Sequence, residues 1–124
     1  MSTKETGDYG EALARRYLRR KFFRILHKNY IARHGEIDII AKNRKYIVFC
    51  EVKTRSDTAT LKYFGRPSNA VNAEKRRHII SAVKEYLHKN NTSLIPRIDI
   101  IEVYINPENE RKYRIEHIEN AFGE

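Results

Sequence analysis

The hydrophobic pattern is most regular between Gly35 and Arg55. Apolar and polar residues alternate there on both sides of the polar segment Asn43–Lys45. Because successive side chains of a strand point to opposite faces, this alternation predicts two antiparallel strands joined by a short turn. One face of the pair is expected to be a plain core face, made of Ile37, Ile39, Ala41, Val48, Cys50 and Val52.

The opposite face of this strand pair is apolar near the turn and charged at its open end. With the turn centred on residues 44–45, Asp38 lies opposite Glu51 and Glu36 lies opposite Lys53. Two carboxylates placed opposite each other repel, and a divalent cation between them removes that repulsion. The pattern therefore predicts a metal site with Lys53 beside it. A solvated strand face with weak ion pairs is the alternative, and these residues alone leave both open.

Helices and strands alternate along the rest of the chain. The other predicted elements are a helix at Thr6–Lys21 with Thr6 as its N-cap, a strand at Phe22–Tyr30, a helix at Ser68–Lys89, and strands at Ile98–Ile105 and Lys112–Ile118. This α-β-β-β-α-β-β order predicts an α/β fold with a central mixed sheet flanked by helices.

Composition restricts the class of protein. A chain of 124 residues with 40% hydrophobic and 33% charged residues is expected to form one folded domain, residues 1–124. Neither a signal peptide nor an apolar run long enough to span a membrane is apparent. The single cysteine, Cys50, excludes an internal disulfide and fits a reducing cytoplasm, which is the expected location.

The net charge points to a polyanionic partner. A formal charge of +9 suits nucleic acid, and DNA is the first expectation. An anionic membrane surface is disfavoured because no segment combines a basic face with a strongly apolar one. The candidate phosphate contacts, chosen by charge and position, are Arg33, Arg55, Arg66, Lys75 and Arg76.

Two further carboxylates have ordinary structural interpretations. Glu11 lies at the border of the apolar face of the first helix, where a glutamate commonly offsets nearby arginines. Asp99 alternates with apolar residues of a strand and is interpreted as a strand-face carboxylate without a catalytic role.

Several ordered motifs carry a family resemblance. They are Gly10-Glu11-x-x-Ala14, Asn29-Tyr30-x-x-Arg33-x-Gly35-Glu36-Ile37-Asp38-Ile39-Ile40, Phe49-x-Glu51-Val52-Lys53-Thr54-Arg55, Phe64-Gly65-x-Pro67-x-x-Ala70-Val71, Lys75 and Asn120-Ala121-Phe122. With these motifs the chain resembles the restriction-endonuclease-like PD-(D/E)xK nuclease superfamily and, within it, the small YraN-like family. The resemblance implies a restriction-endonuclease-like αβββαβ core, to which this chain adds a C-terminal strand.

The resemblance also implies roles for individual residues. Asp38 and Glu51 would hold Mg²⁺ (or Mn²⁺), helped by the main-chain carbonyl of Val52. Lys53 would orient the attacking water and stabilise charge on the phosphate. Glu11 would complete the acidic site from the first helix, as its counterpart does in archaeal Holliday-junction resolvases, which the family resembles.

The expected function is therefore Mg²⁺-dependent endonucleolytic hydrolysis of DNA, with branched or damaged DNA as candidate substrates. The alternative is a non-catalytic nucleic-acid-binding module of the same fold within a larger assembly. A phosphoesterase acting on small nucleotides is a third interpretation, which the charge of +9 disfavours. A homodimer is left open, since cutting both strands of a junction needs two sites.

Overall fold

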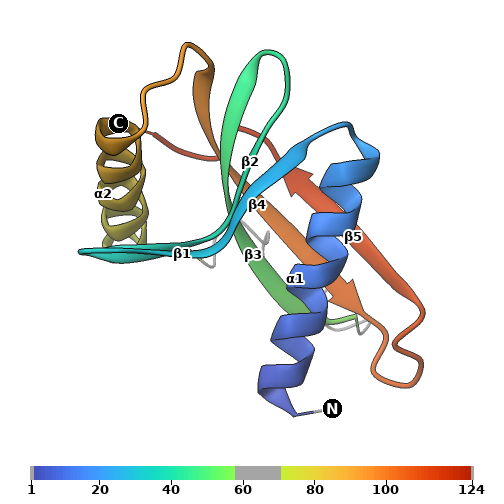
Figure 1. Cartoon of the computed structure of the whole chain (residues 1–124). Coiled ribbons are helices and arrows are strands. Elements are labelled where there is room, and N and C mark those ends of the chain that lie inside the picture. The colour runs from blue at the N-terminus through green and yellow to red at the C-terminus, as the bar shows by residue number, and fades with distance from the viewer. Residues whose placement is uncertain (1, 58–70, 124) are drawn as a thin grey trace.

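The computed structural model describes residues 2–57 and 71–123 of the chain. Its elements are α1 (Thr3–Arg20), β1 (Arg24–Ala32), β2 (Gly35–Lys42), β3 (Tyr46–Ser56), α2 (Ala73–Lys89), β4 (Ile95–Ile105) and β5 (Tyr113–Ile118). The strands form one sheet in the order β1-β2-β3-β4-β5, with α1 and α2 on opposite faces (Figure 1). β3 and β4 are parallel and connected through α2, whereas the other neighbouring pairs are antiparallel. This confirms the predicted α/β fold with an αβββαβ core, a mixed sheet and an extra C-terminal strand.

The first helix begins earlier than predicted. Ser2 is its N-cap: the Ser2 hydroxyl accepts a hydrogen bond from the Glu5 N–H at 3.1 Å, and the Glu5 carboxylate accepts one from the Ser2 N–H at 3.4 Å. This capping box satisfies N–H groups that have no partner inside the helix. Thr6, the predicted N-cap, is instead inside α1, where its hydroxyl donates to the Ser2 carbonyl at 2.9 Å.

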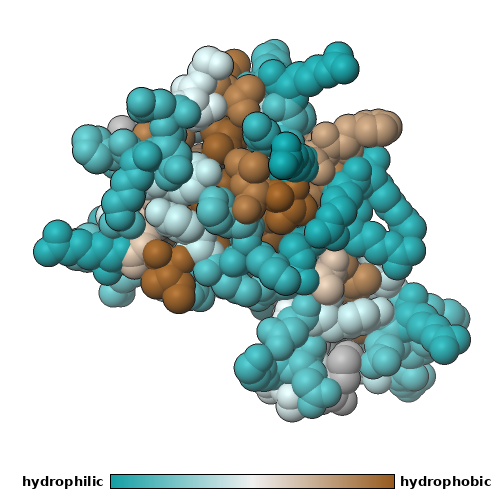
Figure 2. All heavy atoms as spheres, in the orientation of Figure 1, coloured by the Kyte–Doolittle hydropathy of each residue, from teal (hydrophilic) through white to brown (hydrophobic). Residues whose placement is uncertain are grey.

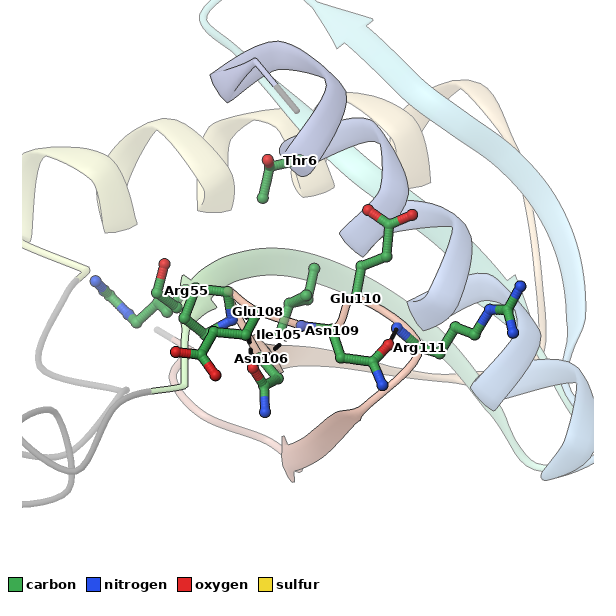
Figure 3. A pocket seen from close by; sticks show the side chains of 10 residues that line it. Thr6, Arg55, Ile105, Asn106, Glu108, Asn109, Glu110 and Arg111 are labelled. Carbon is green, nitrogen blue, oxygen red and sulfur yellow. Dashed lines mark hydrogen bonds between the residues drawn. The ribbon is translucent and has the colours of Figure 1, made fainter.

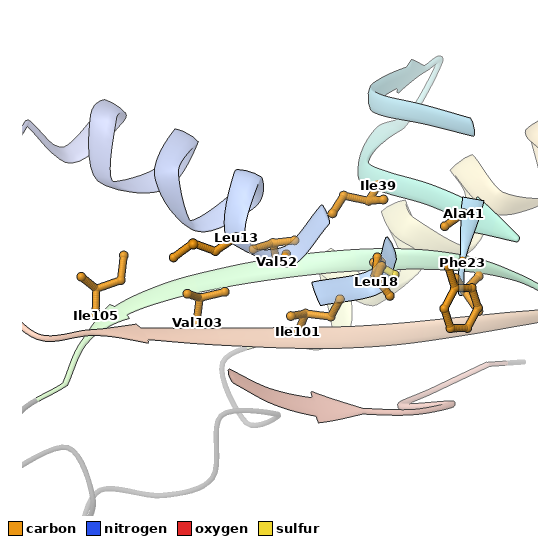
Figure 4. Close-up of a cluster of buried hydrophobic side chains, with 12 residues drawn as sticks. Leu13, Leu18, Phe23, Ile39, Ala41, Val52, Ile101, Val103 and Ile105 are labelled. Atoms are coloured by element: carbon orange, nitrogen blue, oxygen red, sulfur yellow. The ribbon is translucent and has the colours of Figure 1, made fainter. Parts of the chain in front are cut away.

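A first hydrophobic core lies between α1 and one face of the sheet (Figure 4). Its buried members are Leu13, Ala14, Leu18, Phe23, Ile39, Ala41, Val48, Cys50, Val52, Ile101, Val103 and Ile105. Gly10 allows α1 to approach β3 closely, because a Cβ at this position would overlap the Thr54 side chain. The neighbouring Glu11 is thereby brought next to β3.

The turn between β2 and β3 is the predicted one. The Asn43 side chain accepts hydrogen bonds from the N–H groups of Lys45 and Tyr46 at 2.9 and 2.7 Å, a typical asparagine turn. The strand pairing has the predicted register over four pairs: Lys42–Ile47, Ala41–Val48, Ile40–Phe49 and Ile39–Cys50.

Between Gly35 and Asp38, the first half of β2, the strand is separated from β3 and pairs only with β1. Glu36 lies opposite Ile31 of β1, so the predicted pairing of Glu36 with Lys53 is wrong, and the β2–β3 ladder ends one position before the predicted Asp38–Glu51 pair. Ile37 was expected on the same face as Ile39, but it is buried in the second core, under α2. The free end of the β1–β2 hairpin therefore bends away from β3 and lies against α2 (Figure 1).

β1 lies two residues further along the chain than predicted. Phe22 belongs to the turn after α1, with a φ of 70° and a side chain that is 90% exposed. Ile31 and Ala32 were expected in a connecting segment. They are the last residues of β1 and pair with Glu36 and Gly35.

The second core lies between α2 and the other face of the sheet. Its buried members are Ile37, Ile40, Ile47, Phe49, Val71, Ile79, Ala82, Val83, Tyr86, Ile98 and Ile100. The Tyr86 ring makes edge contacts with the rings of His27, Tyr30 and Phe49, at centroid distances of 5.6, 5.2 and 5.6 Å. Aromatic edge contacts of this kind fix β1, β3 and α2 relative to one another.

The start of α2 also differs from the prediction. Asn72 is the N-cap and accepts a hydrogen bond from the Lys75 N–H at 2.8 Å, so the helix begins at Ala73 rather than at Ser68. β4 begins at Ile95, three residues before the predicted start. The last strand agrees with the prediction to within one residue.

Candidate metal and phosphate site

The candidate site lies where β2 separates from β3. The Oδ2 atom of Asp38 accepts a hydrogen bond from the Val52 N–H at 2.8 Å, in place of a main-chain acceptor on β2. The N–H and C=O of one residue in a strand point toward the same neighbouring strand. The Val52 carbonyl therefore points in the same direction as its N–H, toward Asp38. This geometry supports Val52 as an oxygen donor beside the Asp38 carboxylate.

Glu51 is the most buried acidic side chain of the predicted site. It is 6% exposed, and its Oε1 lies 3.4 Å from Lys53 Nζ and 3.5 Å from Lys75 Nζ. Lys53 comes from the same strand, whereas Lys75 comes from the first turn of α2. The sequence predicted Lys75 only as a phosphate contact, and the structure places it at the centre of the acidic site.

The pKa of Asp38 lies well above its ordinary value. Burial, followed by the negative charge of Glu51, raises the pKa of Asp38 to about 7, and the Val52 N–H only partly opposes this. A cation bound between the two carboxylates would oppose both causes, because it favours the charged form of Asp38.

Glu11 reaches this site from α1. A cavity of about 400 Å³ is lined by Glu11 together with Val52 and Lys53. Burial raises the pKa of Glu11, and the charges of Asp8, Glu36 and Glu51 add to the increase while Arg15 opposes it. Glu11 is thus close enough to interact electrostatically with Asp38 and Glu51.

Arg55 and Glu102 form a pair that sequence reasoning did not find. Glu102 is fully buried on β4, and its Oε2 accepts a hydrogen bond from Arg55 Nε at 3.3 Å. Its Oε1 has no hydrogen-bond partner among residues 2–57 and 71–123. Burial raises the pKa of Glu102, although Arg55 and Lys53 oppose the shift. The pair lies next to Lys53, which is opposite Glu102 in the parallel ladder. The only sequence signal was an acidic residue inside an apolar strand.

The other predicted phosphate contacts are dispersed. Arg33 is exposed at the end of the β1–β2 hairpin, and its N–H donates to Glu85 of α2 at 3.2 Å. Arg76 packs over the Phe122 ring at 5.5 Å and donates to the Val71 carbonyl. Arg66 lies outside the described residues.

A cavity of about 490 Å³ lies beyond Arg55, between Thr6 of α1 and the turn that joins β4 to β5 (Figure 3). Its lining has mixed charge, with Arg55 and Arg111 beside Glu108 and Glu110. None of the predicted acidic-site side chains, Glu11, Asp38, Glu51 and Lys53, lines it. This cavity is therefore not part of the acidic site.

The donor atoms fit Mg²⁺ better than a metal that needs a closed protein cage. In the part of the chain that the structure describes, no three His, Cys, Asp or Glu side chains are grouped closely enough to hold a metal ion. Mg²⁺ usually takes only one or two carboxylates and completes its shell with water and phosphate. Asp38, Glu51 and the Val52 carbonyl supply such a partial set.

The raised pKa of Asp38 predicts a pH dependence of stability in the metal-free protein. The unfolded chain releases this proton near pH 4, whereas the folded protein holds it to about pH 7. Asp38 is therefore expected to lower the free energy of unfolding between these two values, and the loss is complete above pH 7. Urea unfolding in EDTA at pH 5, 6, 7 and 8 measures this slope.

Asp38→Asn should flatten that slope, whereas Asp8→Asn, at an exposed ion pair with Lys4, should change it much less. An equal slope in wild type and Asp38→Asn would contradict the raised pKa. The protein with Mg²⁺ should show a weaker slope than the metal-free protein, because the cation favours the charged carboxylate.

Fold and site together define an α/β protein with a largely buried, lysine-flanked carboxylate pair at a break between two strands. The sequence model described as "Uncharacterised protein family UPF0102" matches residues 10–103. A UPF0102 protein of Clostridioides difficile (strain 630) is 46% identical over 123 residues, covering 98% of this chain and 100% of that protein. UPF0102 proteins of Alkaliphilus oremlandii (strain OhILAs) and of Caldanaerobacter subterraneus subsp. tengcongensis are 48% and 42% identical, and cover 96% and 98% of this chain and 98% of each relative.

The chain therefore belongs to the UPF0102 family, and the YraN-like expectation is confirmed at the level of the family. Among residues 2–57 and 71–123, no helix has the length and apolar character needed to cross a membrane.

Proposed function

We propose that the protein is an Mg²⁺- or Mn²⁺-dependent endonuclease of the PD-(D/E)xK superfamily that acts on DNA, with branched or damaged DNA as candidate substrates. The observation that carries the proposal is the buried Glu51 carboxylate, bracketed by Lys53 and Lys75 and placed beside Asp38 where β2 separates from β3. The formal charge of +9 supports a polyanionic substrate. A reducing compartment, the cytoplasm, fits the single buried cysteine, Cys50.

Asp38, Glu51 and the Val52 carbonyl would hold the cation in this proposal. When bound, Mg²⁺ supplies positive charge that stabilises the negative charge developing on the phosphate. Lys53 lies beside Glu51 with 27% of its side chain exposed, so its ammonium can orient water and stabilise the same charge. Lys75 contributes a second ammonium from α2.

Arg55 is placed to bind a neighbouring phosphate of the strand. Its side chain is 36% exposed while the buried Glu102 holds its Nε, so the guanidinium is oriented before DNA arrives. Glu11 approaches the same space from α1 and would complete the acidic site. A homodimer is expected if four-way junctions are the substrate, because two strands must then be cut.

A non-catalytic nucleic-acid-binding module is the second candidate, and one observation favours it. The described residues offer no group of three side-chain metal ligands, and two lysines already neutralise Glu51. Such a protein would use Lys53, Lys75 and Arg55 only to bind phosphate. The two functions differ in whether divalent metal leads to strand scission.

Cleavage of a labelled panel tests the proposed function. Duplex, single-stranded, flap and four-way-junction DNA, together with one RNA, are incubated with Mg²⁺, with Mn²⁺ or with EDTA. We expect metal-dependent cleavage of at least one DNA, with the branched forms preferred, and its loss in Asp38→Asn. Binding without cleavage across the panel would favour the non-catalytic module, and cleavage of RNA alone would replace the proposed substrate.

A further inference from the structure

The free end of the β1–β2 hairpin is braced against α2. A Cβ on Gly35 would lie 2.7 Å from the His78 carbonyl oxygen, so the hairpin backbone touches the α2 backbone directly. The Arg33 N–H donates to Glu85, and the Tyr30 ring packs on Tyr86. These contacts hold the end of the hairpin in one position relative to α2.

This braced end displays a large apolar side chain to solvent. Ile31 is 78% exposed, whereas its neighbour Tyr30 packs inward against α2. In the space-filling view, an apolar group reaches the surface below α2, on the side where the hairpin ends, among hydrophilic side chains (Figure 2). A hollow of about 330 Å³, lined by Ile31, Lys75 and Ile79 among others, lies between the hairpin and α2. A single exposed apolar side chain is common on protein surfaces, so the hollow and its lysine, rather than the exposure of Ile31 alone, point to a bound partner.

The position of Ile31 relative to the acidic site can be read from the strand register. Ile31 lies directly opposite Glu36, so both side chains are on the same face of the hairpin. Asp38 follows Glu36 by two residues along β2, which corresponds to about 7 Å along the strand, and Lys75 contacts both the hollow beside Ile31 and the Glu51 carboxylate. Stacked nucleotides rise about 3.4 Å per step, so Ile31 is about two nucleotides from a phosphate held near Asp38.

The surroundings of Ile31 are basic. Lys28 and Arg33 are exposed on the same hairpin, and Lys75 lines the hollow from α2. A protein partner that covered an isolated isoleucine would be expected to meet a wider apolar surface. DNA matches both features, because the cations contact phosphate while an aliphatic side chain inserts between base steps.

We propose that Ile31 is an apolar wedge that unstacks DNA about two nucleotides from the phosphate bound at Asp38 and Glu51, with the adjoining hollow receiving the displaced base. The proposal rests on the proposed action on DNA and narrows the substrate class to DNA that opens easily. Forks, flaps, junctions and mismatches already lack part of their stacking, so less free energy is needed to open them there. An intact duplex is disfavoured for the same reason.

Fluorescence of 2-aminopurine tests the wedge without requiring cleavage. Forked duplexes each carry one 2-aminopurine at the first, second, third or sixth paired position from the fork, and Glu51→Gln protein keeps the DNA intact. We expect binding to raise the fluorescence at one of the first three positions and not at the sixth. Adding Ile31→Ala should abolish most of this rise and reduce the preference for fork over duplex by about fivefold.

Matched variants separate a wedge from a structural role. Ile31→Leu keeps an apolar side chain and should restore the fluorescence rise. Ile95→Ala should leave the rise unchanged, because this half-exposed isoleucine lies opposite Tyr46, where β3 and β4 begin. The thermal midpoint of Ile31→Ala should equal that of the parent, since this side chain is exposed.

The outcomes distinguish the wedge from the nuclease. A rise that persists in Ile31→Ala, or DNA bound without any rise, overturns the wedge even if the wild type cleaves DNA. A fluorescence rise that depends on Ile31, in a protein that cleaves no DNA, supports the wedge and contradicts the proposed nuclease activity. If Ile31→Ala leaves the fluorescence rise unchanged but alters the oligomeric state in light scattering, Ile31 belongs to a contact between protein chains instead.

Discussion

Replacing Glu51 by glutamine is expected to lower Mg²⁺-dependent DNA cleavage by about a thousandfold or more, since metal-assisted charge stabilisation supplies several kcal/mol. Glutamine keeps the shape of the side chain and removes its charge. The acidic pair then has one carboxylate, too few to hold the cation well, and Lys53 and Lys75 lose their shared partner. Single-turnover cleavage of the best substrate of the panel measures the effect.

Calorimetric titration with Mg²⁺ or Mn²⁺ shows whether the loss follows from metal binding. Glu51→Gln should bind metal much more weakly than wild type, while its fold survives because Lys53 and Lys75 remain partly exposed to water. Glu116→Gln is the matched control, at a half-exposed glutamate on β5. Cleavage by Glu51→Gln at the wild-type rate would remove Glu51 from the site. Normal metal binding with no cleavage would instead assign Glu51 to the chemistry alone.

The predicted register of β2 and β3 was correct because it depends on local features. Alternation fixes the face of each residue, and Asn43 favours the turn, so the pairing from Lys42 to Ile39 followed directly. The separation of β2 from β3 was not predicted. It accompanies the packing of the hairpin on α2 through Gly35 and Tyr30, contacts between segments far apart in the chain.

Contacts between distant segments also limited how much of the site could be predicted. Asp38, Glu51 and Lys53 could be found because the alternation of the sequence predicts them on one face of the strand pair. Lys75 joins Glu51 only through the crossover that carries α2 back over the sheet. Glu102 and Asp99 showed the same sequence signal, an acidic residue in an apolar strand, yet they differ in structure. Glu102 faces Arg55 near the site, whereas Asp99 is enclosed in a separate polar network on the opposite side of the sheet.

That network explains why Asp99 is tolerated in the interior. Asp99 is fully buried and accepts two hydrogen bonds from Arg97, both at 2.9 Å, and one from the Asn120 N–H at 3.0 Å. His117 Nε2 lies 2.7 Å from Oδ2, and its Nδ1 lies 2.9 Å from the Tyr17 hydroxyl. Because a carboxylate only accepts, Nε2 carries the proton of the bond to Asp99, and Nδ1 makes the bond to the Tyr17 hydroxyl. Burial alone would raise the pKa of Asp99, but the bonds from His117, Arg97 and Asn120 outweigh it and lower the pKa.

Asp99→Asn is therefore expected to destabilise the fold by about 3–5 kcal/mol, because it removes the buried partner of the Arg97 guanidinium and leaves only the exposed Glu119 carboxylate at 3.8 Å. Urea unfolding at pH 7 measures the difference, and Asp8→Asn, which removes an exposed ion pair with Lys4, should change stability far less. An acid with a lowered pKa stabilises the fold above its unfolded value. The difference between wild type and Asp99→Asn should thus be full at neutral pH and shrink as the pH falls below about 4. A loss under 1 kcal/mol at pH 7, or a difference that does not shrink in acid, would show that the Asp99 charge contributes little to stability.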